Sequence, residues 1–112
     1  MISVTHTITL KNSMKRKPTH PGVVLKEDIL KPLGLSVTKA AEYLDISRKT
    51  LSAIINERQA VTSNIAMRIG LATKTSPQSW LNMQDKLNLW KEENKDYNII
   101  PFPQVTEEIM EM

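Results

Sequence analysis

The chain has 112 residues, a net charge of +3 at neutral pH and no cysteine. This length suits one domain with tails, and the core is small because the chain has only one Phe, two Trp and two Tyr. A disulfide framework is excluded, and the lack of cysteine fits a reducing cytoplasm. No apolar run approaches the roughly 20 residues of a membrane-spanning helix, and the N-terminus lacks the apolar segment of a secretion signal.

The charge is unevenly distributed along the chain. Residues 1–31 carry six bases and two acids, whereas residues 91–112 carry two bases and six acids. A basic front and an acidic end suggest a polyanion as one partner and a different partner at the other end, although the acidic end can equally be a solubilising tail. We expect an N-terminal extension, disordered, at residues 1–14, a folded domain at residues 15–95 and an acidic C-terminal tail at residues 96–112.

The first expected helix follows a basic arm formed by Lys15, Arg16 and Lys17. Met14 looks like a natural beginning, so the sequence leaves open whether residues 1–13 belong to the native protein. Pro21 is suited to the first position of a helix, which we expect to run to about Leu30 before Pro32 ends it.

The stretch from Val37 to Thr62 predicts two short helices joined by a tight turn. Ser36 and Ser47 can each cap one of them, because a serine hydroxyl accepts a backbone N–H that the first turn leaves unpaired. Asp45 stands where the chain must turn, and Asp tolerates the left-handed conformation that such a turn needs. Ile46 fills the corner. The apolar residues at helical spacing are Val37, Ala40, Ala41 and Leu44 in the first helix and Leu51, Ile54 and Ile55 in the second.

The side of the second helix that faces solvent carries a row of small polar and basic side chains. Arg48 and Lys49 occupy its first turn, where the helix dipole disfavours cations, and a phosphate or guanine edge would compensate that cost. Thr38 and Arg58 are suited to phosphate oxygens. The predicted DNA-binding residues are Thr38, Ser47, Arg48, Lys49, Thr50, Ser52, Ala53, Asn56 and Arg58. The alternative is an ordinary solvated helix face.

Two further helices complete the pattern. Thr62 or Ser63 can cap a helix to about Ala72, and Ser76-Pro77 can begin a helix that ends near Asn94. Ile65, Ala66, Ile69 and Leu71 of the fourth helix are available for the core. The last helix carries Trp80, Leu81, Gln84, Leu87 and Trp90 at helical spacing. Of these, we expect Trp80 and Leu81 in the core, and Leu87 and Trp90 to be dimerisation residues, partly shared with a second subunit.

Catalysis is not expected from this sequence. The two histidines, His6 and His20, lack local ligand partners, and Glu27 and Asp28 are adjacent, so they point apart on a helix. Three glycines form no phosphate-binding loop. We therefore assign no catalytic residue, no metal ligand and no cofactor.

At these residues the chain resembles the Cro/cI-like (XRE) helix-turn-helix family, and more narrowly the HigA-type, VapI-like antitoxins. The resemblance covers roughly residues 15–95. It rests on His20-Pro21-Gly22, on Leu33-Gly34-Leu35-Ser36, on the run from Ile46 to Ile69, and on Trp80-Leu81-Asn82-Met83-Gln84. Relatives commonly have Gly where this chain has Asp45 and Glu57, so we expect some strain where Glu57 leaves the second helix.

The resemblance implies an all-α, five-helix, Cro/cI-like (lambda-repressor-like) domain with flexible termini. It also implies a homodimer that binds a palindromic operator in double-stranded DNA, represses its own operon and neutralises a HigB-like, mRNA-cleaving toxin. Such a protein would act in the bacterial cytoplasm, associated with the nucleoid when bound to its operator, and would have no membrane partner. The alternative is a stand-alone Cro/cI-type transcriptional regulator with no toxin partner.

Overall fold

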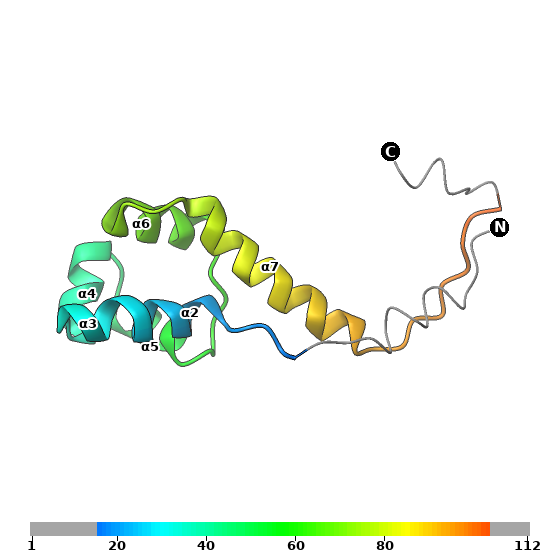
Figure 1. Cartoon of the computed structure of the whole chain (residues 1–112), viewed down its shortest axis with the longest axis horizontal. Helices are drawn as coiled ribbons and strands as arrows, with labels where there is room; N and C mark the ends of the chain where they lie inside the picture. The colour runs from blue at the N-terminus through cyan, green and yellow to red at the C-terminus, as the bar shows by residue number, and fades with distance from the viewer. Residues whose placement is uncertain (1–15, 104–112) are drawn as a thin grey trace.

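A computed structural model describes residues 16–103 of the chain, and within that range every regular element is helical (Figure 1). The elements are α2 (Pro21–Val24), η1 (Leu25–Leu30), α3 (Lys31–Leu33), α4 (Val37–Leu44), α5 (Arg48–Ile55), α6 (Ser63–Thr73) and α7 (Pro77–Glu93). Because α2, η1 and α3 follow one another without a break, residues 16–103 contain five helices. The expected all-α fold is confirmed, whereas the expectations for residues 1–14 and 104–112 lie outside the described residues.

The first helix contains a π-helical stretch, η1, and does not end where the sequence predicts. We expected Pro32 to end it near Leu30, but the helix continues to Leu33. In a regular α-helix the Pro32 ring would crowd the carbonyl of Asp28, and the wider π turn, in which the Lys31 N–H donates to the Lys26 carbonyl, relieves that crowding. The helix ends instead at Gly34, whose φ of 67° is left-handed.

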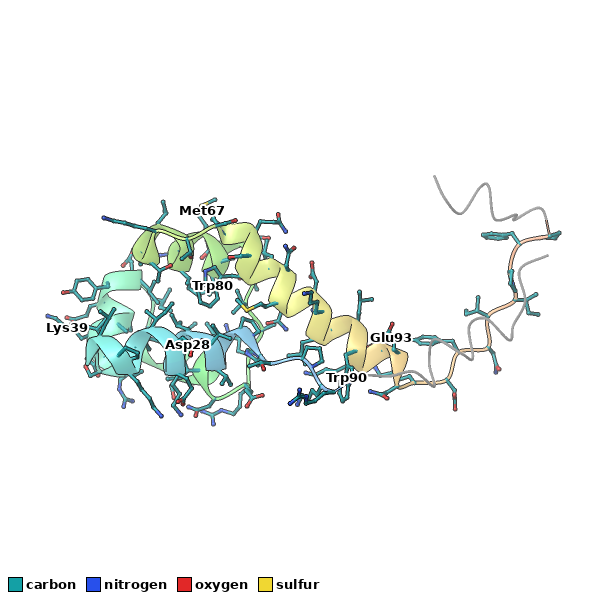
Figure 2. All side chains as sticks on the ribbon, viewed as in Figure 1. Asp28, Lys39, Met67, Trp80, Trp90 and Glu93 are labelled. Carbon is teal, nitrogen blue, oxygen red and sulfur yellow. The ribbon has the colours of Figure 1, made fainter. Side chains whose placement is uncertain are left out.

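The core lies where α4, α5 and α6 meet the first helix and the beginning of α7. Trp80 is buried inside it, as Figure 2 shows, and its ring N–H donates to the Thr75 hydroxyl at 2.8 Å. Leu81 is half-buried against the same core. The buried apolar side chains of this cluster are Leu25, Leu30, Ala40, Ala41, Leu44, Leu51, Ile54, Ile55, Val61, Ile65, Ala66, Ile69 and Trp80.

One core prediction for α6 is wrong. Leu71 is 74% exposed, whereas Ile65, Ala66 and Ile69 are buried as expected. Leu71 lies two residues beyond Ile69, which places it about 200° around the helix from that buried position. An apolar side chain on the outer face of α6 is therefore left mostly uncovered by the described part of the chain.

The first helix packs directly against the backbone of α5 at Gly22. A Cβ at this position would lie 2.0 Å from the backbone oxygen of Ile54, a distance that no side chain can occupy. His20, just before the helix, caps it: its Nδ1 accepts the Gly22 N–H at 2.9 Å. The position and tilt of α5 thus depend on a backbone-to-backbone contact that only glycine allows.

We expect Gly22→Ala to destabilise the fold by about 3 kcal/mol, because the backbone of Ile54 would have to move. Gly34→Ala is the matched control: a Cβ there meets nothing within 4 Å, so only the left-handed backbone is penalised, at about 1 kcal/mol. Urea denaturation of both variants measures the two losses. Equal losses, or a larger one for Gly34→Ala, would show that the contact with Ile54 is not tight.

His20 is a buried titratable group beside the end of α5. Burial is the main cause that lowers the pKa of its imidazole, the carboxylate of Glu57 opposes that shift, and Lys91 adds to it. A neutral Nδ1 can accept the Gly22 N–H, whereas the doubly protonated ring cannot. Protonation would therefore remove the cap of the first helix and place a charge in the interior.

The lowered pKa of His20 fixes the sign of its effect on stability. The unfolded chain titrates at about pH 6.5 and the folded chain at a lower value, so the stabilisation is complete above about pH 6.5 and is lost as the pH falls through the folded value. We expect the Tm of the wild type to fall more between pH 7.5 and pH 5 than that of His20→Asn, since Asn can still cap. An equal fall in both would contradict a role for His20.

Candidate nucleic-acid interface

The turn between α4 and α5 has the geometry that the sequence predicts. Asp45 adopts φ 55° and ψ 47°, and the following Ile46 N–H donates back to the Ala41 carbonyl at 3.1 Å. Ser47 then caps α5, its hydroxyl accepting the Thr50 N–H at 3.0 Å. Ser36 caps α4 in the same way through the Lys39 N–H. The two short helices are therefore joined by a fixed three-residue turn.

Arg68 closes this turn from α6, a role that the sequence did not reveal. Its Nη1 donates to the backbone carbonyls of Leu44 and Asp45, each at 3.0 Å, and its Nε donates to Asn64. A guanidinium suits the last carbonyls of a helix, which carry unpaired lone pairs and partial negative charge. The only sequence signal was one Arg beside the buried positions of α6, and surface helices commonly show that pattern.

The apolar side of α5 determines which side faces solvent. Leu51, Ile54 and Ile55 are buried, so the opposite side is centred on Lys49, Ala53 and Asn56, at i, i+4 and i+7. Among the predicted DNA-binding residues, the exposed ones are Thr38, Ser47, Arg48, Lys49, Asn56 and Arg58, and the half-buried ones are Thr50, Ser52 and Ala53. The structure thus brings the predicted side chains together on one face of α5 and on the adjoining start of α4.

Arg48 and Thr38 are in direct contact across the two helices. The Nε of Arg48 donates to the Thr38 hydroxyl oxygen at 3.1 Å. The guanidinium is thereby held beside the N-terminal ends of both α4 and α5, where backbone N–H groups also point outward. Together they form a cationic corner that suits a phosphate group.

Asn56 is turned back onto its own helix. Its side-chain N–H donates to the Ser52 carbonyl at 2.8 Å, and the Ser52 hydroxyl lies 3.4 Å away. Bidentate contact with an adenine edge uses both the N–H and the oxygen of an asparagine amide. One of the two amide hydrogens of Asn56 is therefore engaged with Ser52, and the other hydrogen and the amide oxygen are left for a base.

Glu57 ends α5 in the left-handed conformation, as expected from its position. Its φ is 62°, and the next N–H, that of Arg58, donates to the Ala53 carbonyl at 2.8 Å. This is the closing pattern that glycine usually provides, so Glu57 accepts a strain of about 1–2 kcal/mol. Arg58 follows at once and is exposed, next to the end of the helix.

Gln84 connects the segment after α5 to the long helix α7. This side chain is buried, and its Oε1 accepts the Val61 N–H at 2.8 Å while its Nε2 donates to Asn88. The bond satisfies a buried backbone donor, which would otherwise be costly. It also ties the end of the α4–α5 unit to α7.

The two residues predicted to form a dimer contact behave differently. Leu87 is 1% exposed within the single chain, so we correct its assignment: burial against its own chain leaves it no surface to share. Trp90, one turn further along α7 and labelled in Figure 2, is half-buried. Between these two residues in the sequence, Leu89 is an apolar side chain that is exposed.

This geometry is that of a helix-turn-helix unit, and comparisons with known proteins agree. The sequence profile of the helix-turn-helix family matches residues 26–80. A helix-turn-helix transcriptional regulator of Haemophilus influenzae, itself uncharacterised, is 39% identical, with 75% of this chain and 79% of that protein aligned. Antitoxin HigA-1 of Vibrio cholerae is 33% identical, with 72% and 76% aligned.

A solved structure extends the similarity to the fold. Pseudomonas aeruginosa antitoxin HigA, solved with the higBA promoter, superposes with a TM-score of 0.65 at 31% identity, covering 67% of this chain and 82% of that one. The chain belongs to the Cro/cI (XRE) helix-turn-helix family, among its HigA-type, VapI-like antitoxins. It is a HigA-like DNA-binding regulator, and this family is not enzymatic. Among residues 16–103, none of the helices has the length and apolar character that a membrane crossing requires.

We expect Lys49→Ala and Arg58→Ala to weaken DNA binding in different ways. Lys49 lies at the centre of the outward face, so its loss costs about 1–3 kcal/mol on the operator and relaxes specificity at one base pair. Loss of Arg58, beside the helix end, weakens operator and scrambled DNA alike and lowers the salt slope by about 1. Anisotropy titrations at several salt concentrations separate the two effects.

Lys86→Ala provides the matched control for these titrations. Lys86 is an exposed lysine on α7, outside the α4–α5 unit, and removing it changes the net charge by the same amount. We expect a much smaller effect on operator binding. If all three variants bind equally well, the outward face of α5 is not the DNA contact.

Proposed function

We propose that this protein is an antitoxin that binds the operator of its own operon and neutralises a HigB-like, mRNA-cleaving toxin. The observation that supports the DNA-binding part most strongly is the two-sided character of α5. Leu51, Ile54 and Ile55 are buried, and Lys49 and Asn56 are exposed on the other side. A short helix with that arrangement, held by a preceding helix and a tight turn, fits the major groove.

The predicted residues divide into base contacts and backbone contacts. Lys49, Ser52 and Asn56 would hydrogen-bond to base edges, and Ala53 leaves room for a thymine methyl group. The backbone contacts would fix the position of the protein on the duplex but would not select the sequence. They are Thr38, Ser47, Arg48, Thr50 and Arg58.

The active species in this proposal is a two-fold homodimer. Two copies related by a two-fold axis present their α5 helices to a palindrome, with half-sites about 34 Å apart, one turn of DNA. The surface for this contact would lie on the second half of α7, at half-buried Trp90 and exposed Leu89. Pairing across such a surface would also stabilise a small core.

The toxin partner is supported by the relatives. The Vibrio cholerae relative is named antitoxin HigA-1, and the Pseudomonas aeruginosa HigA was solved on the higBA promoter. The Haemophilus influenzae relative is named only as a transcriptional regulator. This name supports the second candidate function, a stand-alone regulator without a toxin. In either case the protein would act in the bacterial cytoplasm, on operator DNA.

Co-expression with the adjacent gene distinguishes these two functions. If a small toxin-like reading frame lies beside this gene, we expect its product to arrest growth when expressed alone, to lose toxicity on co-expression, and to purify as a complex with this protein. The double variant Lys49→Ala/Arg58→Ala is the control: it should still rescue growth while failing to bind the operator. Lack of complex formation with any neighbouring product would favour the stand-alone regulator.

A further inference from the structure

The fold leaves an open apolar groove at the end of the molecule formed by α3, α4 and α6. This α3–α6 groove has a volume of about 350 Å³ and is lined mainly by apolar side chains, among them Leu33, Leu35, Tyr43 and Ala72. Tyr43 is 67% exposed, and together with Leu71 and Arg68 it continues into an adjoining hollow. Apolar side chains that line an open groove are a candidate surface for contact with a partner.

A second uncovered apolar segment lies at the opposite end of the molecule, after α7 (Figure 1). The chain leaves the helix in a defined direction, because Lys95 and the Tyr97 hydroxyl both bond to the carboxylate of Glu92. The next part, Ile99–Phe102, which we call the apolar tail segment, is largely uncovered by the rest of residues 16–103: Ile100 is 88% and Phe102 81% exposed. Two unsatisfied apolar surfaces therefore exist on one chain.

Ile99 and Ile100, the first residues of the tail segment, cannot reach the groove of their own chain. α7 has 17 residues and is about 25 Å long, and the groove lies beyond its beginning. From Asn94 to Ile99 the chain can extend at most about 17 Å. An intramolecular contact between Ile99 or Ile100 and Leu71 would therefore require α7 to unfold or bend.

We propose that the apolar tail segment of one copy docks in the α3–α6 groove of a second copy, so that two tails clasp the dimer reciprocally. This inference rests on the homodimer of the proposed function. If the two α7 helices pair antiparallel about an axis near Leu89 and Trp90, Asn94 of one copy lies beside Asp85 of the other, about 12 Å short of the beginning of that helix. The extended chain from Asn94 to Phe102 can span that gap toward the partner's groove, which includes the end of α6 at Thr73, just before α7 begins at Pro77.

The charges of the two surfaces favour the same pairing. Residues 58–84, which include α6, contain three bases and no acid, whereas residues 96–112 contain four acids and no base. Arg68 lines the adjoining hollow together with Leu71, and Lys74 follows Leu71 by three residues in the sequence. An acidic tail with apolar side chains thus matches an apolar groove with a cationic border, which favours this arrangement over two copies joined groove to groove.

Crosslinking between copies tests the proposal directly, because the chain has no cysteine of its own. Ile100→Cys and Leu71→Cys are prepared as separate proteins, mixed at a concentration at which the wild type is dimeric, and treated with a short bis-maleimide. We expect a covalent heterodimer of the two variants. Met67→Cys replaces Leu71→Cys as the control, since Met67 is also exposed on α6 but does not line the groove (Figure 2).

Sedimentation equilibrium supplies an independent measurement that does not depend on crosslinker geometry. Leu71→Glu adds an acid where the acidic tail would dock, so we expect at least a tenfold rise in the dimer Kd, while Met67→Glu leaves it nearly unchanged. Crosslinking no better than the Met67→Cys control, together with an unaltered Kd for Leu71→Glu, overturns the proposal. If such a dimer still binds the operator, the docking fails and the proposed function stands.

Discussion

The packing of α5 against the first helix determines the orientation of the DNA-binding surface. Gly22 lies so close to the Ile54 carbonyl that no side chain fits between them, and Leu51, Ile54 and Ile55 are buried on that side. Each buried aliphatic side chain contributes about 1.5–3 kcal/mol. A rotation of α5 would expose these side chains, so Lys49 and Asn56 face outward because the opposite side is committed to the core.

Charged residues occupy and stabilise the ends of α4 and α5, where many proteins use glycine and apolar contacts. Asp45 and Glu57 adopt left-handed backbone conformations at the ends of α4 and α5, and Arg68 binds the last carbonyls of α4. These positions carry strain, yet each is offset by hydrogen bonds to the adjacent helix end. The small unit keeps its geometry although two of its ends lack glycine.

Much of this arrangement could be predicted from the sequence. Both serine caps, the turn at Asp45 and the inward residues of α5 follow from local rules: capping chemistry, backbone preference and helical periodicity. The errors concern longer-range packing. Pro32 did not end the first helix, because the wider π turn of η1 accommodates it. Leu71, expected in the core, is exposed, and Leu87, expected at a dimer contact, is buried. Arg68 was missed because its acceptors lie more than twenty residues away in the chain, where no local pattern refers to them.

The bond between Gln84 and Val61 has a consequence for the thermodynamics of association. Since α7 is fixed to the end of the α4–α5 unit, and Arg68 fixes the turn, the backbone that would face DNA is already ordered before any encounter. Preorganisation of this kind reduces the entropy that binding must remove. What remains to be ordered is a few long side chains, since Asn56 is already held on its helix by Ser52.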